Sequence, residues 1–258
     1  MRSGMRSGMR AFGRLVRCVV HGLHGVAIVL LVFPWLDAAG RQARIRWWSV
    51  KMLGAIGVAL RVEGLAPERG CLLVVNHVSW LDIMAVHAVA PGARFVSKSD
   101  VKGWPLLSRL VDSAGTLYLE RQRKRDALRV VHAMADALRA GDTVAIFPEG
   151  TTSTGHGLLP FHANLLQAAI ATATPVQPAA LRYADAGGAV SEAVEFVGRT
   201  TLLQSLWRTA GGEGVTATLS FLPPRPSAGL ERRAFAVQLR ADIGTALGLD
   251  AEAPPAER

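Results

Sequence analysis

The residues best suited to catalysis lie in one stretch, where an imidazole at position 77 precedes a carboxylate at position 82. His77 follows the apolar run Cys71–Val75, which predicts a buried strand, and Ser79 with Asp82 is spaced like a capping box that opens a helix. In a continuous helix, residues five apart point about 140° away from each other, so His77 and Asp82 meet only if the chain turns between them. A strand running into a helix supplies that turn. The pair then predicts a general base held by a carboxylate.

The pair alone is weak evidence for catalysis. With seven histidines and ten aspartates, the chain contains about 0.3 pairs of this spacing by chance, and a lone histidine beside an apolar strand is more often a packing or capping residue. A second stretch, Phe147–Thr151, changes this balance, because it also follows an apolar strand, predicted over Thr143–Ile146. Polar turns at the ends of two strands can meet in one crevice.

Four short motifs follow one another along the chain. They read NHVSWLD at 76–82, GTLYLER at 115–121, FPEGT at 147–151 and PVQP at 175–178. In order and separation they resemble the four motifs of the 1-acylglycerol-3-phosphate acyltransferase family, and the resemblance spans roughly residues 63–224. Each motif alone is unspecific, but four in this order indicate the family.

The resemblance implies an acyltransferase that moves a fatty acyl chain from acyl-CoA or acyl carrier protein to the sn-2 hydroxyl of lysophosphatidate, giving phosphatidate. His77 then takes the proton of the acceptor hydroxyl while that oxygen attacks the thioester, and Asp82 orients His77. The acceptor oxygen is itself the nucleophile, so no covalent acyl-enzyme is required. We expect no metal and no cofactor beyond the thioester co-substrate. Ser79 is an alternative nucleophile, although we favour the capping role, and the GxSxG elbow of serine lipases does not occur.

Further residues match the acceptor-binding positions of the family. Arg121 matches the arginine that contacts the acceptor phosphate, to which its forked guanidinium is suited. Glu149 and Gly150, with the adjoining Thr151, match the acceptor-binding turn, although Glu149 could equally make a structural hydrogen bond to the backbone. Lys98, at the end of a predicted strand, is a further candidate for the acceptor phosphate.

Two residues depart from the pattern of phosphatidate-forming members. Glu120 stands where aspartate is frequent, and Thr152 follows the third motif where arginine is frequent. One cation fewer weakens the case for a glycerol-phosphate head. The alternatives are therefore an acyltransferase for another lysolipid such as lyso-ornithine lipid and, from a different class, a non-catalytic lipid-binding membrane protein. An intact His77/Asp82 pair argues against the latter, because a binder needs no base.

The composition is both basic and apolar. The net charge is +9, half of the residues are hydrophobic and the mean hydropathy is +0.26. This combination favours an anionic membrane surface over nucleic acid, for which no binding motif is found. Cys18 and Cys71 are the only cysteines, one in a basic leader and one in a core strand, so we expect no disulfide.

The amino-terminal 57 residues predict a membrane-associated pair of helices. A leader with five arginines and no acidic residue precedes the apolar run Val26–Leu36, and arginines beside Trp47 and Trp48 precede a second run, Met52–Leu60. Tryptophan and arginine flanking apolar helices are typical of interfacial anchors. We expect residues 1–57 to dip into or cross the inner membrane. The alternatives are a signal peptide and a helical hairpin packed on the domain itself.

The rest of the chain alternates strands with helices. This alternation predicts an α/β domain over residues 58–249, with a mainly parallel mixed sheet flanked by helices and a frayed tail at 250–258; we expect this domain to face the cytosol. Strands are expected at 58–62, 71–75, 94–98, 116–119, 143–147, 176–183, 194–196 and 215–221, and helices at 104–111, 126–141, 162–172, 202–208 and 231–247. We interpret His87 and His162 as packing residues and His132 with Asp136 as a surface pair.

Overall fold

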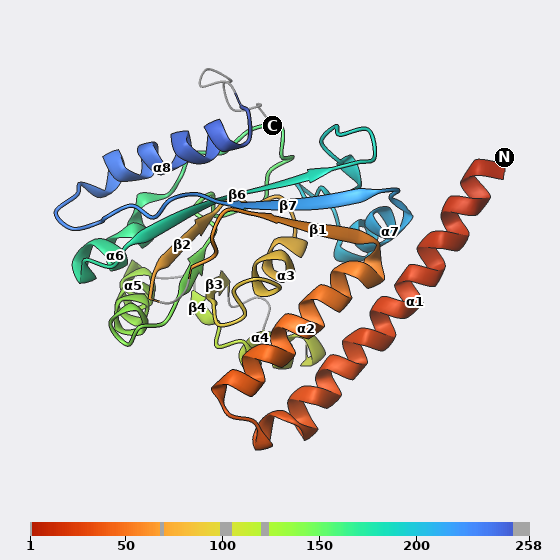
Figure 1. Cartoon of the computed structure of the whole chain (residues 1–258), viewed down its shortest axis with the longest axis horizontal. Helices are drawn as coiled ribbons and strands as arrows, with labels where there is room; N and C mark the ends of the chain where they lie inside the picture. Colours follow the sequence, from red (N-terminus) through yellow and green to blue (C-terminus); the bar gives the residue numbers. More distant parts are fainter. Residues whose placement is uncertain (1, 68–69, 99–104, 120–123, 250–258) are drawn as a thin grey trace.

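The computed structural model describes residues 2–67, 70–98, 105–119 and 124–249 (Figure 1). At its centre is a seven-stranded sheet in the order β1-β7-β6-β2-β5-β3-β4. All of the strand pairs are parallel except β6 with β7. The strands are β1 (Val58–Glu63), β2 (Leu72–Val75), β3 (Arg94–Lys98), β4 (Leu117–Leu119), β5 (Val144–Ile146), β6 (Val176–Ala184) and β7 (Val215–Phe221). The predicted α/β fold with a mainly parallel mixed sheet is confirmed.

Helices cover both faces of this sheet, and β2 shows how the sequence divides between them. Leu73 and Val75 join one hydrophobic cluster, while Leu72 and Val74 join the other, because successive strand residues point to opposite faces. All four are fully buried, as expected for a strand covered on both sides. The first cluster packs against α1 (Arg2–Leu31), α2 (Ala38–Ile56), α3 (Leu81–His87) and α7 (Leu202–Gly211), and the second against α5 (Lys124–Arg139), α6 (Gln167–Thr172) and α8 (Arg232–Ala246).

The predicted amino-terminal pair of helices is present as the antiparallel hairpin of α1 and α2 (Figure 1). A short 3₁₀ turn, Phe33–Trp35, joins the two helices. They are locked by a reciprocal contact in which the Trp48 indole donates to the His21 carbonyl at 3.0 Å and the His21 ring bonds the Trp48 carbonyl at 2.9 Å. Gly25 permits this approach, since a Cβ there would lie 2.3 Å from the indole nitrogen.

The basic leader is helical and belongs to α1. Its Arg14 guanidinium donates to the carbonyls of Ala210 at 3.0 Å and Gly212 at 2.6 Å, at the carboxyl end of α7. Cations are favoured at that end of a helix, where carbonyls lack partners within the helix. The amino-terminal half of α1 is therefore held against the α/β domain.

Three local predictions need correction. The strand expected at 194–196 is absent: residue 194 ends the 3₁₀ turn Glu192–Val194 and residues 195–196 are irregular. Arg208 and Thr209 of α7 donate to the carbonyls of residues 192, 193 and 195, which a strand would offer to a neighbour. Helix α5 begins at Lys124, so Asp126 lies inside it and is not its N-cap. The helix expected over 162–172 opens with a 3₁₀ turn at Ala163–Leu166, followed by α6.

Candidate active site

The first and third motifs meet because they follow neighbouring parallel strands. Val74 of β2 lies opposite Ile146 of β5, so the segments that follow these two strands leave the sheet at the same edge. The side chain of Asn76 then fixes the first motif to β6, the strand that pairs with β2 on the side opposite β5. Its amide donates to the Leu181 carbonyl at 2.9 Å, and its oxygen accepts the Leu181 N–H at 2.7 Å.

His77 and Asp82 face each other as the spacing predicts. The His77 Nδ1 lies 2.7 Å from the Asp82 Oδ2, and the turn between β2 and α3 brings them together. The His77 side chain is 19% exposed, whereas that of Asp82 is fully buried. With Nδ1 bound to the carboxylate, Nε2 is the ring nitrogen that can take a proton from a substrate.

Asp82 accepts four hydrogen bonds. Besides His77, the N–H groups of Val78 and Ser79 donate to Oδ2 at 2.7 and 2.9 Å, and the hydroxyl of Tyr183 donates to Oδ1 at 2.8 Å. Only acceptor roles are used, as in an ionised carboxylate. The carboxyl group is thereby fixed from both oxygens.

The predicted capping role of Ser79 is wrong. Helix α3 begins at Leu81, and the residue at its N-cap is Trp80. The Ser79 hydroxyl is buried and has no hydrogen-bond partner among the described residues. Of the two hydrogen bonds of a capping box, only one forms: the Asp82 carboxylate accepts the backbone N–H of Ser79.

The third motif holds the backbone of His77. Glu149, which is 3% exposed, accepts the His77 N–H on Oε1 at 2.7 Å and the Leu159 N–H on Oε2 at 2.9 Å. The N–H of Ser153 donates to the His77 carbonyl at 2.8 Å. Burial raises the pKa of Glu149 to about 7, although the two backbone donors oppose this shift. Of the two roles considered for Glu149, the structure shows the backbone hydrogen bonds.

The imidazole of His77 stacks on the ring of Phe147. Their centroids are 4.0 Å apart and the planes are inclined by 8°. Phe147 stacks in turn on Phe95 of β3, with centroids 5.4 Å apart. The ring of His77 is therefore fixed by the Asp82 carboxylate at Nδ1 and by the face of Phe147, and its backbone is fixed by Glu149.

The other predicted acceptor residues are placed in part. Gly150 has φ +68° and its Cα hydrogen faces His162, whose ring would lie 3.1 Å from an added Cβ. Thr151 is exposed, and the neighbouring Thr152 donates its hydroxyl to the Phe196 carbonyl. Lys98 ends β3, but its side chain lies outside the described part, and Arg121 lies wholly outside the described residues.

An apolar cavity of about 350 Å³ lies beside this site. Phe95, which stacks on Phe147, contributes to its wall, so two rings separate the cavity from His77. Sequence reasoning missed this cavity because helices distant in the chain enclose it. Its wall comes from α1, α2, α3, α4 (Pro105–Ser113) and α7, and includes Val29, Met52, Met84, Leu110 and Leu206.

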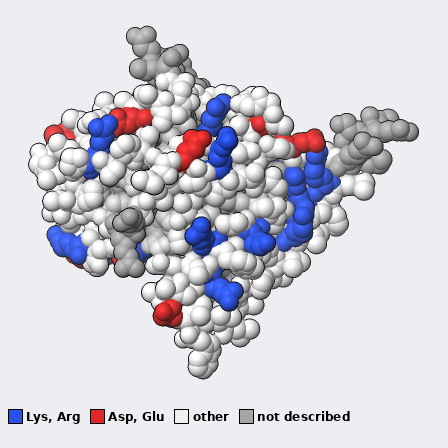
Figure 2. All heavy atoms as spheres, viewed as in Figure 1, with Lys and Arg blue, Asp and Glu red and all other residues white. Residues whose placement is uncertain are grey.

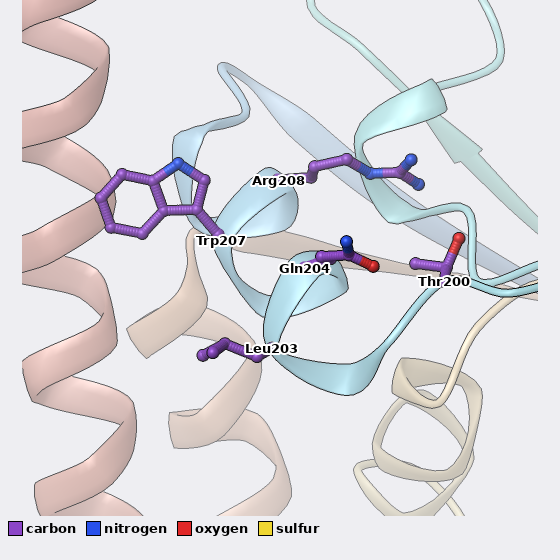
Figure 3. A pocket seen from close by; sticks show the side chains of 5 residues that line it. All are labelled: Thr200, Leu203, Gln204, Trp207 and Arg208. Carbon is purple, nitrogen blue, oxygen red and sulfur yellow. The ribbon is translucent and has the colours of Figure 1, made fainter.

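A second hollow lies on the outer side of α7 and contains none of the motif residues. It has a volume of about 580 Å³ and is lined by Thr200, Leu203, Gln204, Trp207 and Arg208. In Figure 3 the Trp207 ring points towards α1, while the Arg208 side chain points away from it. Leu203 is 72% exposed and Trp207 48% exposed, so this hollow is a surface feature and not the reaction site.

Comparison with known proteins identifies the family. The model of the acyltransferase family matches residues 59–182, which contain all four motifs. A lyso-ornithine lipid O-acyltransferase from Pseudomonas aeruginosa is 38% identical over 237 residues, 91% of either chain. The chain belongs to the acyltransferase family. A 1-acyl-sn-glycerol-3-phosphate acyltransferase from Neisseria meningitidis is 39% identical to this acyltransferase over 175 residues, 66% of this chain and 67% of the other.

The fold of this acyltransferase is also that of a known enzyme. The crystal structure of the 1-acyl-sn-glycerophosphate acyltransferase from Thermotoga maritima superposes with a TM-score of 0.74, at 17% identity, over 99% of this chain and all of the other. At that identity the likeness concerns the fold alone. Among the described residues of the acyltransferase, no three His, Cys, Asp or Glu side chains gather as they would around a metal ion.

Proposed function

We propose that this acyltransferase moves a fatty acyl chain from a thioester, acyl-CoA or acyl carrier protein, to a lysolipid hydroxyl, with His77 as the general base. The observation that carries this proposal is the 2.7 Å contact of His77 Nδ1 with the buried, four-fold bonded Asp82 carboxylate. A base so held keeps one tautomer, with Nε2 open to the acceptor.

The chemical step follows from this geometry. His77 Nε2 takes the hydroxyl proton as the acceptor oxygen attacks the thioester carbonyl, and Asp82 stabilises the imidazolium that forms. Collapse of the tetrahedral intermediate breaks the C–S bond and releases the thiolate, which takes the proton back from His77. The products are an ester and a free thiol, and the base is regenerated.

The apolar cavity is the proposed site for the acyl chain. Most of its lining residues are aliphatic or aromatic, and it lies next to the Phe95–Phe147–His77 stack. The polar lining residues are Arg44, Ser49, His87, Ser97, Ser113 and Thr116. A fatty chain there would place its thioester end towards the base. Burial of the chain contributes about 0.8 kcal/mol per methylene.

For the acceptor we propose lyso-ornithine lipid. Thr152 stands where phosphatidate-forming members of the resembled family often carry arginine, and its hydroxyl donates to the Phe196 carbonyl. An ornithine head carries an amine and a carboxylate without a phosphate. The Pseudomonas relative named for this acceptor matches over nearly the whole chain. Lysophosphatidate is the second candidate, favoured by the Neisseria relative and by the resemblance of Arg121 to the phosphate-contacting arginine.

The membrane-facing surface is proposed to be the outer face of α1. Large apolar side chains recur on it at helical spacing, among them Phe12, Val16, Val19 and Leu23, each more than 45% exposed. By length and composition, Ser7–Leu31 could also cross a membrane. Because the opposite face of α1 packs on α2 and α7, we propose that α1 lies in the inner membrane surface, with the α/β domain in the cytosol. Figure 2 shows basic side chains gathered beside α1, suited to anionic lipids.

The experiment is an acceptor panel with the purified full chain in lipid vesicles, assayed with acyl-CoA and with acyl carrier protein. We expect kcat/KM for lyso-ornithine lipid to exceed that for lysophosphatidate at least ten-fold. The reverse order would establish the second candidate. The variant His77→Ala should lose turnover while its thermal unfolding remains that of a folded protein, and undiminished turnover would remove the mechanism. Absence of turnover with every acceptor would instead support the alternative that the chain is a non-catalytic lipid-binding membrane protein.

A further inference from the structure

Among the described residues, the hydroxyl of Tyr183 is the one hydrogen-bond partner of the His77 and Asp82 side chains that comes from none of the four motifs. Tyr183 lies near the end of β6, is 1% exposed, and donates to Asp82 Oδ1 at 2.8 Å. The other three donors to Asp82 all bond Oδ2 and belong to residues 77–79. Tyr183 alone therefore fixes the second oxygen of the carboxylate, and with it the rotation of that group.

Tyr183 is itself rigidly placed. Its strand pairs with β2 on one side and β7 on the other, and in β7 it lies opposite Ala217. The backbone of Leu181, two residues earlier, makes both hydrogen bonds with the Asn76 side chain: its carbonyl accepts one and its N–H donates the other. Strand β6 thus holds the first motif at two points, before His77 through Asn76 and after it through Asp82.

The phenol remains a donor at every pH at which the enzyme works. Burial, followed by the charge of Asp82, raises the pKa of Tyr183 well above its usual range. A neutral hydroxyl buried against a carboxylate spreads part of that negative charge away from His77. Removal of the hydroxyl should leave Asp82 a stronger acceptor for the imidazole and less well oriented.

We propose that Tyr183 is a positioning residue for the acyl transfer, acting through Asp82 on the orientation and basicity of the His77 imidazole. This inference rests on the proposed function only for its kinetic consequences, because the hydrogen-bonded chain Tyr183–Asp82–His77 can be tested without substrate. The residue contacts no reacting atom in this scheme.

The test is Tyr183→Phe, which keeps the ring and removes the hydroxyl. We expect kcat to fall roughly ten-fold, since a hydrogen bond to a charged group is lost, while KM changes less than two-fold. The acidic limb of kcat/KM against pH should move to higher pH. In proton NMR of the apo enzyme, the downfield Nδ1–H signal, identified by its loss in His77→Gln, should move further downfield. In an Asp82→Asn background the same substitution should have no further effect on kcat.

Two comparisons separate positioning from structure. Ser227→Ala also removes a buried hydroxyl, one that donates to the carbonyls of Ala169 and Thr174 and, among the described residues, makes no hydrogen bond with the first or third motif. This variant should lower stability without moving the pH profile or the NMR signal. Should Tyr183→Phe not fold, 3-fluorotyrosine in a Tyr118→Phe background, where Tyr183 is the only tyrosine, gives a stronger donor and shifts of opposite sign. An unchanged signal and profile in the folded variant would overturn the proposal. Absence of turnover in the wild type would instead overturn the proposed function and leave the NMR comparison readable.

Discussion

The carboxylate of Glu149 accepts the backbone N–H of His77 at 2.7 Å, so the third motif holds His77 by its main chain. Its other oxygen accepts the N–H of Leu159, ten residues further along. A buried acid in a lipid-modifying site invites a catalytic role, but here both oxygens are used to close the loop that follows β5 onto the end of β2. The two motifs are parts of one structural unit.

Glu149→Gln should therefore impair both folding and turnover. An amide offers one acceptor oxygen, so one of the two buried N–H groups loses its partner, at a cost of about 1–3 kcal/mol in the free energy of unfolding. We expect kcat to fall about ten- to a hundred-fold, less than in His77→Ala. Urea unfolding and steady-state assays measure these effects. Glu231→Gln is the matched control, because Glu231 also accepts two backbone N–H groups, at the exposed start of α8, and its variant should retain turnover.

The raised pKa of Glu149 predicts a pH-dependent stability. The carboxyl titrates near 7 in the folded chain and near 4.5 when unfolded. Between these values the unfolded state has released the proton that the folded state retains, so the free energy of unfolding should decrease as pH rises from about 4.5 to 7, by at most about 1.4 kcal/mol per unit. This contribution should be absent from Glu149→Gln. Urea titrations of both proteins at several pH values measure it, and parallel curves would contradict the assignment.

His87 predicts the opposite trend. It is buried against Phe95 with its Nε2 3.0 Å from the Ala93 carbonyl, and burial lowers its pKa to about 4. The stability that neutral His87 contributes is complete above pH 6.5 and is lost as pH falls towards 4. His87→Gln keeps a donor for the Ala93 carbonyl and cannot take up a proton. We expect this variant to lose less stability than the wild type between pH 6.5 and 4 in urea unfolding, and an equal loss would exclude His87 as the cause.

The cavity makes a prediction about acyl chain length. Leu206 of α7 contributes to its wall, so Leu206→Trp reduces its volume. With a series of acyl-CoA donors, the preferred chain should become shorter by two or more carbons, because the remaining space holds fewer methylenes. Leu128→Trp on the exposed side of α5 is the same substitution outside the cavity and should leave the chain-length profile unchanged. A profile unaltered by Leu206→Trp would place the acyl chain elsewhere.

The outer face of α1 makes a prediction about membrane binding. Val19 is 62% exposed on that face, and burial of a valine side chain in lipid is worth about 1.5 kcal/mol or more, so Val19→Asp should weaken vesicle binding by ten-fold or more. Val237 on α8 is 70% exposed and lies away from α1, which makes Val237→Asp the matched control. Sedimentation with vesicles containing anionic lipid measures both. Equal binding by the two variants would contradict the proposed surface.

Much of the site could be predicted from local sequence. The His77/Asp82 spacing requires a turn, and the apolar runs before the first and third motifs are strands that end at the same edge, so proximity followed from the topology. The capping role of Ser79 could not be judged from spacing alone. The same spacing allows the carboxylate to gather backbone N–H groups while the hydroxyl is left out, and only packing decides between these arrangements.

Contacts between distant segments escaped prediction. Tyr183 is one residue of an unremarkable apolar strand, and its hydroxyl reaches Asp82 only through the strand order of the sheet. Residues 194–196 carry a valine and a phenylalanine, which favour a strand, but α7 donates to the carbonyls of this region. The cavity is enclosed by five helices together with residues of β3, so no single stretch of sequence predicts it.

The His77/Asp82 pair and the residues matched to the acceptor come from different segments of the chain. His77, Asp82 and most of the hydrogen bonds to the Asp82 carboxylate come from one strand end, whereas the residues that the family resemblance matches to the acceptor, Lys98, Arg121 and 149–151, lie further along the chain. The loop after β5 is tied to His77 through Glu149 and Ser153, so it cannot change freely without moving the imidazole. Under the proposed function, this separation of base and acceptor residues accounts for the nearly equal identity of this chain to relatives named for two different head groups.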